Sequence, residues 1–461
     1  MFFNTWVFFI FFAIFLVIFY GIRKLPMLRI SFLVIASFMF YGWLGWWLPL
    51  LMVYITVVNY VCVRMMVKSD HKKMWLAAAV TLSLLVLCFF KYTDFAVENI
   101  NAAFNLELPL LSSLPKWRWA VQPAGLSFFT FQGLSYAIDA YRGEVKPETN
   151  IIRFAAYISF FTNILSGPIE RASNLLPQIE RVPRLTMQDV TDGASLFLVG
   201  LFKKAVLADW LGKYVDTIYP DPSTATTAGL VAATFAYTWQ IYFDFAGYTD
   251  MARGVARLMG FKVILNFNNP YTATDLGDFW GRWHISLSSW IKDYLYIPLG
   301  GNRKGPARMY FNIFVAMVLS GIWHGAAWTY IVWGALHAIG RMITREAERT
   351  PFYRDRVPRF CKQLLVFCFV MITWIFFRAS TIGDGWTIFS RIFSTSWLAD
   401  PRLPMLPIMF VLIIWTYQFL YNSKLQGLLR PAPVRVALAV LMIVCLFVCQ
   451  QAPAKFIYTQ Y

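Results

Sequence analysis

The first 20 residues include the run FFNTWVFFIFFAIFLVIFY (residues 2–20), in which no side chain is charged. A helix of this length crosses the hydrocarbon core of a bilayer, which takes about 20 residues. Arg23, Lys24 and Arg29 follow directly. Because Lys and Arg gather in cytoplasmic loops, this order predicts a first span with its N-terminus outside. No charged residue precedes the run and no A-x-A cleavage site follows it, so we interpret it as a span and not as a cleaved signal peptide.

Similar apolar runs recur along the chain and predict about eleven or twelve crossings. Composition agrees, because 59% of the 461 residues are hydrophobic and 14% are charged, against roughly 25% charged in a soluble domain. The expected fold class is therefore an all-α polytopic membrane protein. The further spans are expected at about 30–44, 48–63, 74–90, 151–166, 193–208, 226–246, 309–323, 325–341, 360–378, 404–420 and 434–450.

We expect the whole chain, residues 1–461, to form one integral-membrane domain. We divide it into N-terminal helices (1–120), a catalytic core (121–345) and C-terminal helices (346–461). Residues 91–120 are more polar and are expected outside, whereas the charged loop 345–362 is expected in the cytoplasm. VQPAGLSFFTFQGLSYAIDAYRG (121–143) is apolar but contains Pro123, Gly125 and Gly133, which predicts a re-entrant or tilted helix broken at these positions.

Charge and cysteine content limit the possible partners. The net charge of +17 is explained by membrane topology, and it is also compatible with an anionic ligand or lipid surface. The basic residues are dispersed among loops, so nothing indicates nucleic-acid binding. The six cysteines lie in or beside apolar segments without close histidines, so no bound metal is expected.

One histidine lies within an apolar run at LSGIWHGAAWTY (319–330). Ionisable groups inside a membrane are costly and are functional candidates, and imidazole can accept and return a proton near neutral pH. Gly321 and Gly325 would allow a helix or a substrate to approach closely, and Trp323 and Trp328 could exclude water. A catalytic base and a hydrogen-bonded core residue both remain open for His324.

A second histidine, His284, lies in LGDFWGRWHISLSSWIKDYLYIPLGG (276–301), which has the 3.6-residue periodicity of an amphipathic helix. Trp280 and His284 would share one face of that helix. Asp278 and Arg282 could form an i,i+4 ion pair, which would give Arg282 a structural role. For His284 a catalytic role and a satisfied polar core residue are again both open.

Three further features carry weaker signals. His337 lies 13 residues after His324 and would point to the opposite side if one helix held both. The turn Gly300–Gly305 (GGNRKG) could bind phosphates through Arg303 and Lys304, or could simply be a cytoplasmic turn; it is not a P-loop. Asn266 and Asn268 open a polar stretch that continues to the second histidine.

Taken together, NFNNPYTATDLGDFWGRWHISLSSWIKDYLYIPLGGNRKG (266–305) and LSGIWHGAAWTYIVWGALH (319–337) resemble the membrane-bound O-acyltransferase family. The similarity is strongest to the bacterial branch with the membrane subunit of the alginate O-acetylation machinery. YGWLGWWLPLL (41–51), ISFFTNILSGPIER (158–171) and the aromatic ending FIYTQY (456–461) also fit. The likeness thus extends over most of the chain.

This resemblance implies a ring of tilted helices around a tunnel, with His324 of the WHG tripeptide as catalytic base and His284 of the RWH motif as second polar residue. His284 would orient the thioester or stabilise the oxyanion, and Trp283 and Trp323 would shape the site. Arg282, Asn266, Asn268, Arg303 and Lys304 complete the expected substrate- and donor-binding set. No permanently bound cofactor is expected, and acetyl-CoA, or an acyl carrier, would supply the acyl group.

The resulting hypothesis is a multi-pass O-acetyltransferase of the bacterial inner membrane. It would pass acetyl groups to an extracytoplasmic polysaccharide such as alginate, together with a periplasmic partner related to SGNH hydrolases. D-alanyl transfer to teichoic acid is the alternative within the family, because the related enzyme also has RWH and WHG elements. Its counterpart of PLGGNRKG is different, so this motif favours the acetylating branch. A transporter is the alternative from another class, but no inverted repeat is found.

Overall fold

The computed structural model describes all residues except 115–122, 182–183, 395–402, 430 and 450–461. The aromatic ending at 456–461 therefore lies outside the described residues. The described chain is helical without strands, which confirms the all-α membrane fold class. Its contacts divide it into two compact units, of which unit 1 comprises the described residues of 1–197 and 249–264 and unit 2 those of 198–248 and 265–449.

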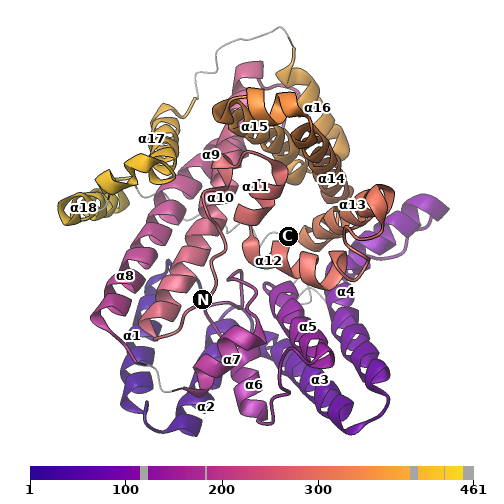
Figure 1. Ribbon diagram of the computed structural model, residues 1–461, viewed down its shortest axis with the longest axis vertical. Helices are drawn as coiled ribbons and strands as arrows, with labels where there is room; N and C mark the ends of the chain where they lie inside the picture. The colour runs from indigo at the N-terminus through magenta and orange to yellow at the C-terminus, as the bar shows by residue number, and fades with distance from the viewer. Residues whose placement is uncertain (115–122, 182–183, 395–402, 430, 450–461) are drawn as a thin grey trace. The chain divides into compact units, whose positions relative to one another are not determined.

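Unit 1 is formed by the N-terminal helices. In Figure 1 the helices α3, α4 and α5 lie side by side, and each contacts the other two. The bounds are α1 (Trp6–Gly21), α2 (Pro26–Gly42), α3 (Leu48–Lys68), α4 (Lys72–Phe104), α5 (Leu126–Arg142), α6 (Ile151–Ile158) and α7 (Ala172–Glu180), with a 3₁₀ turn at Leu111–Ser113. Helix α8 (Met187–Phe202) continues from unit 1 into unit 2.

In unit 2, α13 and α14 pack along each other. The α-helices of this unit follow in chain order. They are α9 (Asp209–Ile218), α10 (Thr227–Leu258, shared with unit 1), α11 (Leu276–Arg282), α12 (Ile285–Ile291), α13 (Gly305–His324), α14 (Trp328–Arg349), α15 (Arg359–Arg378), α16 (Ile382–Ile392), α17 (Met405–Tyr421) and α18 (Ala432–Val448). Short 3₁₀ turns lie at Pro270–Thr272 and Lys424–Leu429, and π-helical turns at Lys203–Ala208, Lys292–Tyr296 and Phe352–Arg356.

Four of the described helices, α3, α4, α13 and α15, are long and apolar enough to cross a membrane, and α1, α2, α17 and α18 are shorter apolar helices. Their exposed side chains are largely Phe, Leu, Ile, Val and Trp. In water such a surface would be unstable, whereas in lipid it is the expected one. These helices agree with the predicted spans at both ends of the chain.

Three predicted elements differ from the structure. Helix α4 continues to Phe104, well beyond residue 90, where the predicted span ends. Helix α6 has only eight residues, which at 1.5 Å per residue is too short for the span predicted at 151–166. Helix α5 is not interrupted at Gly133: a Cβ there would lie 2.8 Å from Nδ2 of Asn59 on α3, so this glycine permits close helix packing and does not break the helix.

A buried ion-pair cluster lies around the first π-helical turn of unit 2. The Nζ atom of Lys204 lies 2.8 Å from Oδ1 of Asp209 and 2.6 Å from Oδ1 of Asp244. All three side chains are almost fully buried. A buried charge requires such partners, so the cluster joins the π-helical turn and the start of α9 to the middle of α10.

Candidate active site

The segment that carries His284 is broken into two short helices, and the predicted single amphipathic helix over 276–301 is wrong. Helix α11 ends at Arg282, α12 begins at Ile285, and His284 between them has φ 42° and ψ 54°. This left-handed conformation is uncommon for a residue other than glycine. Trp280 and His284 therefore do not share a helix face.

The break is held by the polar stretch that begins at Asn266. The backbone N–H of Ile285 donates to the carbonyl of Asn266 at 2.9 Å, and the N–H of Asn268 donates to the carbonyl of Arg282 at 2.9 Å. These bonds replace the i→i−4 bonds of a continuous helix. A residue in a costly conformation persists only where its surroundings hold it, and such residues cluster at functional sites.

Asn266 also determines the orientation of the His284 imidazole. Its Oδ1 atom accepts hydrogen bonds from the backbone N–H of Ser286 at 3.2 Å and from the Ser286 hydroxyl at 3.0 Å. Nδ1 of His284 lies 3.2 Å from the same oxygen. Both Asn266 and His284 are fully buried. Because an amide oxygen only accepts, Nδ1 carries the proton in this bond.

His324 is the last residue of α13, and the backbone there is closely packed against the start of α14. A Cβ on Gly325 would lie 2.1 Å from Cε2 of Tyr330, and a Cβ on Gly321 would lie 2.2 Å from the Tyr330 carbonyl oxygen. The predicted close approach at these two glycines is confirmed. The C-terminal end of a helix carries partial negative charge, which favours a histidine that becomes protonated there.

The two histidines lie beside each other in unit 2. The ring centroids of His284 and His324 are 6.3 Å apart, and the Trp323 ring lies 5.8 Å from His284 and 5.0 Å from His324. Trp333 and Phe377 each pack edge-on against His324 at 5.2 Å. Only 3% of His324 is exposed. The arrangement can transfer protons between buried imidazoles and bound substrates with little access for water.

His337 lies on α14 and not on the helix that ends at His324, so the two residues are not opposite sides of one helix. Its ring is 4.7 Å from that of Trp333, and the Trp333 ring is also 5.2 Å from that of His324. The Nε2 atom of His337 lies 2.9 Å from Oγ1 of Thr373 on α15. Trp333 therefore lies between His337 and His324, in ring contact with both.

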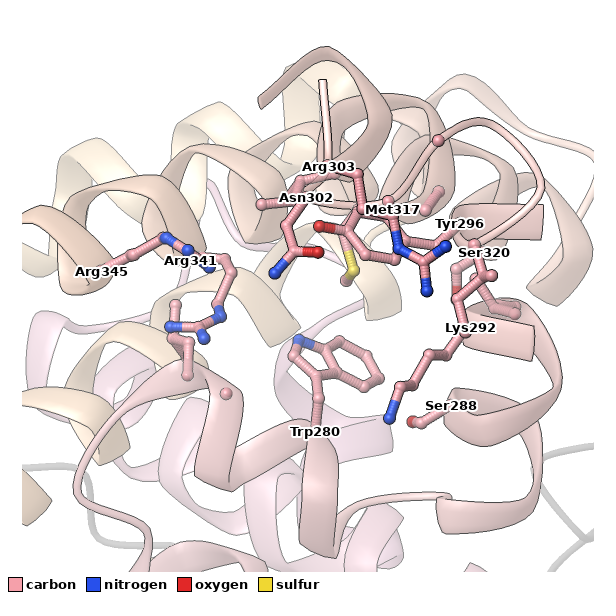
Figure 2. A pocket seen from close by; sticks show the side chains of 18 residues that line it. Trp280, Ser288, Lys292, Tyr296, Asn302, Arg303, Met317, Ser320, Arg341 and Arg345 are labelled. Carbon is pink, nitrogen blue, oxygen red and sulfur yellow. The ribbon is translucent and has the colours of Figure 1, made fainter. Parts of the chain in front are cut away.

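A cavity of about 590 Å³ lies next to the site in unit 2, within the size range of small-molecule sites. Figure 2 shows Arg341 and Arg345 on one side of it, Lys292 and Arg303 on the other, and Trp280 between them. Ser320 also lines the cavity, one helical turn before His324 on α13. The cavity therefore combines four cationic side chains with a serine one helical turn from His324, and neither histidine of the pair is among its lining residues.

The other residues that the sequence predicts for the site differ in burial and in their contacts. Trp283 is fully buried against Phe267 and Trp374, with ring centroids at 5.0 Å in both pairs. Arg282 donates from Nε to Oδ1 of Asp278 at 2.6 Å, which confirms the predicted ion pair. Asn268 is exposed and joins the break through its backbone. Arg303 lines the cavity, whereas Lys304 is exposed outside its lining.

Several residues at the site were not predicted from the sequence. Phe377 and Trp333 form the walls around His324, and they come from α15 and α14. Arg341 and Arg345 have i,i+4 spacing after the WHG tripeptide, so both fall on one helix face. This spacing in the sequence is enough to predict that the two arginines lie together. No pattern near Phe377 in the sequence predicts its contact with His324.

Comparisons with known proteins show the family of this chain. Residues 140–383 match the family model described as MBOAT, membrane-bound O-acyltransferase family. A probable alginate O-acetylase AlgI of Pseudomonas aeruginosa is 37% identical over 84% of this chain and 74% of its own.

Two further relatives differ in how much of the chain they cover. A peptidoglycan O-acetyltransferase of Helicobacter pylori is 32% identical over 78% of this chain and 73% of its own. A teichoic acid D-alanyltransferase of Bacillus subtilis is 31% identical over only 47% of this chain and 57% of its own. This protein is a multi-pass acyltransferase that belongs to the membrane-bound O-acyltransferase family.

Proposed function

We propose that this protein transfers acetyl groups from cytoplasmic acetyl-CoA across the membrane for the O-acetylation of an extracytoplasmic polysaccharide such as alginate. The observation that carries the proposal is the pair of imidazoles 6.3 Å apart beside a cavity lined by four cations. The names of the relatives with the longer matches, the alginate and peptidoglycan O-acetylating enzymes, support acetyl as the acyl group.

The cavity suits the nucleotide end of the donor. Arginine and lysine bind phosphates by charge-assisted hydrogen bonds, and Arg303, Arg341, Arg345 and Lys292 line opposite sides of the cavity. Arg345 belongs to the charged segment expected in the cytoplasm. A donor whose phosphates occupy this cavity could extend its thioester arm past Trp280 and Ser320 toward the histidine pair.

His324 acts as general base in this proposal. The acceptor hydroxyl gives its proton to the imidazole while its oxygen attacks the thioester carbonyl carbon. The C–S bond then breaks, and the imidazolium returns the proton to the leaving thiolate, which departs as free CoA thiol. The position of His324 at the end of α13 stabilises its transient positive charge. Trp323, Trp333 and Phe377 exclude water, which would otherwise hydrolyse the thioester.

The acceptor side of the reaction involves a partner. We place the protein in the bacterial inner membrane, with a periplasmic protein related to SGNH hydrolases completing the transfer to the polymer. The support is the similarity to the alginate O-acetylase over 84% of the chain.

The test is acetyl-CoA turnover by purified protein with acceptor polysaccharide and partner present. His324→Ala is expected to lower kcat by at least about 1,000-fold, as loss of an essential base does. The matched control is His71→Ala, because His71 is exposed at the N-terminus of α4 and its replacement should leave kcat unchanged. Turnover by His324→Ala at the wild-type rate would refute the proposal.

A further inference from the structure

In the carboxamide of Asn266, the oxygen has hydrogen-bond partners and the nitrogen has none among the described residues. Its oxygen accepts from Ser286 and His284, as described above. Its nitrogen Nδ2 is buried and has no hydrogen-bond partner among the described residues. Asn266 is fully buried, so bulk solvent does not reach this donor. Such an orphan donor in a native site requires an explanation, because the full desolvation cost of the group is otherwise left uncompensated.

The unsatisfied donor lies beside His284, one member of the histidine pair. Nδ2 is bonded to the same carbon as Oδ1, and Oδ1 is 3.2 Å from the His284 imidazole, whose ring centroid is 6.3 Å from that of His324. The hydrogen bonds from Ser286 also prevent an exchange of the amide oxygen and nitrogen, because a backbone N–H must face an acceptor. The N–H groups of Asn266 are therefore held in place before any substrate binds.

The same hydrogen bond limits what His284 can do. With its proton on Nδ1, neutral His284 presents a lone pair at Nε2 and has no second N–H to donate. A lone pair does not stabilise negative charge on a carbonyl oxygen. A donor held in place within a buried site does so effectively.

We propose that Asn266 is the oxyanion donor of this acyltransferase, and that its oxygen at the same time holds His284 in the Nδ1–H tautomer. As the acceptor hydroxyl attacks the thioester carbon, the carbonyl π electrons move onto oxygen, and Nδ2–H of Asn266 donates to that oxyanion. When the electrons return, the C–S bond breaks and the thiolate takes the proton held by His324. This inference rests on the acyl transfer from acetyl-CoA proposed above.

Two substitutions separate this role from a structural one. Asn266→Ala removes both ends of the amide, whereas Asn266→Asp keeps an acceptor for Ser286 and His284 and replaces the donor by a charged acceptor oxygen. We expect both variants to lower kcat by about 100- to 1,000-fold, as the loss of one oxyanion donor does, with KM for acetyl-CoA nearly unchanged. Lowering the pH should partly restore Asn266→Asp, because a protonated carboxyl group can donate.

A residue that only braces the turn would give another pattern. In that case Asn266→Asp would restore most of the activity lost in Asn266→Ala, and the inference would be overturned. A rise in KM with kcat unchanged would overturn it as well. If Asn266→Ala does not fold, as judged by gel filtration in detergent, the isosteric Asn266→Asp decides alone by its kcat and its pH profile.

The matched control is Asn59→Ala. Asn59 is also fully buried, but it lies on α3 in unit 1, where its Nδ2 donates to the Ile55 carbonyl at 2.9 Å. Its loss should leave kcat unchanged. The wild-type protein separates this inference from the proposed function, because absence of acetyl-CoA turnover in the wild type refutes the proposed function itself. Normal wild-type turnover with an active Asn266→Asp variant refutes only the role of Asn266.

Discussion

At the scale of single residues, the position of His324 depends on how closely two backbones can meet. Gly325, directly after it, has φ −162° and ψ 154°, a conformation that any residue can adopt. The restriction is therefore one of space, because the ring of Tyr330 occupies the place of a Cβ. The WHG tripeptide needs its glycine for this reason.

We expect Gly325→Ala to lower kcat for acetyl-CoA by roughly 10- to 100-fold, because small displacements of a catalytic group have effects of this size. Steady-state kinetics on the purified variant measure the change. Gly281→Ala is the matched control, because a Cβ on Gly281 meets no atom within 4 Å. Equal kcat values for Gly325→Ala and the wild type would show that His324 tolerates the shift.

The sequence predicts much of the site at this scale. The RWH and WHG motifs indicate His284 and His324, and the structure brings these two residues together. The left-handed backbone of His284 was not predictable from local pattern, because residues about 18 positions away hold it, through Asn266 and Asn268. The periodicity of residues 276–301 favoured a continuous helix, and the long-range bonds override it.

At the scale of elements, the connection between α6 and α7 ends in a buried carboxyl group. Glu170 is fully buried, and its side chain accepts hydrogen bonds from Nδ2 of Asn174 at 2.7 Å and from the backbone N–H of Ile264 at 2.5 Å. Burial raises the pKa of Glu170 from 4.5 to about 7, although these hydrogen bonds oppose the shift. Glu170 thus joins α7 to the segment after α10 within unit 1.

The raised pKa of Glu170 predicts that stability falls as the pH rises. Below pH 4.5 the carboxyl group is protonated in the folded and unfolded states alike. Between that pH and about 7, only the unfolded chain has lost the proton, so unfolding becomes more favourable, by roughly 3 kcal/mol in total. Unfolding temperatures in detergent from pH 5 to pH 8 measure this decline.

Glu170→Gln should remove this decline, since glutamine does not titrate and still offers an oxygen to Ile264. The matched control is Glu148→Gln in the same unit, which should keep the wild-type slope. If wild-type and Glu170→Gln proteins lose stability equally between pH 5 and pH 8, Glu170 is not the group responsible.

The existence of most membrane helices is predictable from the sequence, whereas the ends of some helices are not. Apolar runs predict the existence of α1, α2, α3, α13 and α15, because each must cover its backbone in lipid. The ends of α4 and α6 were not predictable in the same way. Helix α4 continues into polar sequence beyond the apolar run, and α6 stops within one, where the side chains of residues 159–169 are buried in unit 1.

At the scale of the whole molecule, part of the excess positive charge is concentrated around one cavity. Composition gives a net charge of +17 but not its distribution in space. Four of the cations line one cavity in unit 2, which only the packing of α11 to α14 could show. The division into two units at 197–198, 248–249 and 264–265 falls inside α8, inside α10 and in the segment after α10, without a compositional boundary.

The cationic cavity predicts a binding effect that is separate from chemistry. Arg345→Ala should raise KM for acetyl-CoA by roughly 3- to 10-fold and leave kcat unchanged, because phosphate contacts act equally on ground and transition states. With S-acetylpantetheine, which lacks the nucleotide, the variant and the wild type should have equal KM values. Arg349→Ala is the matched control, since Arg349 pairs with Glu346 at 2.8 Å outside the cavity lining. A lower kcat with unchanged KM in Arg345→Ala would contradict this role.

The central claim is that the acetyl group passes the membrane through the histidine pair. The direct measurement supplies labelled acetyl-CoA to one face of oriented proteoliposomes, with acceptor polysaccharide and partner on the other face, and follows label on the acceptor. The account predicts labelled acceptor in step with CoA release for the wild type, and neither product for His324→Ala. Labelled acceptor formed by His324→Ala at the wild-type rate would contradict it.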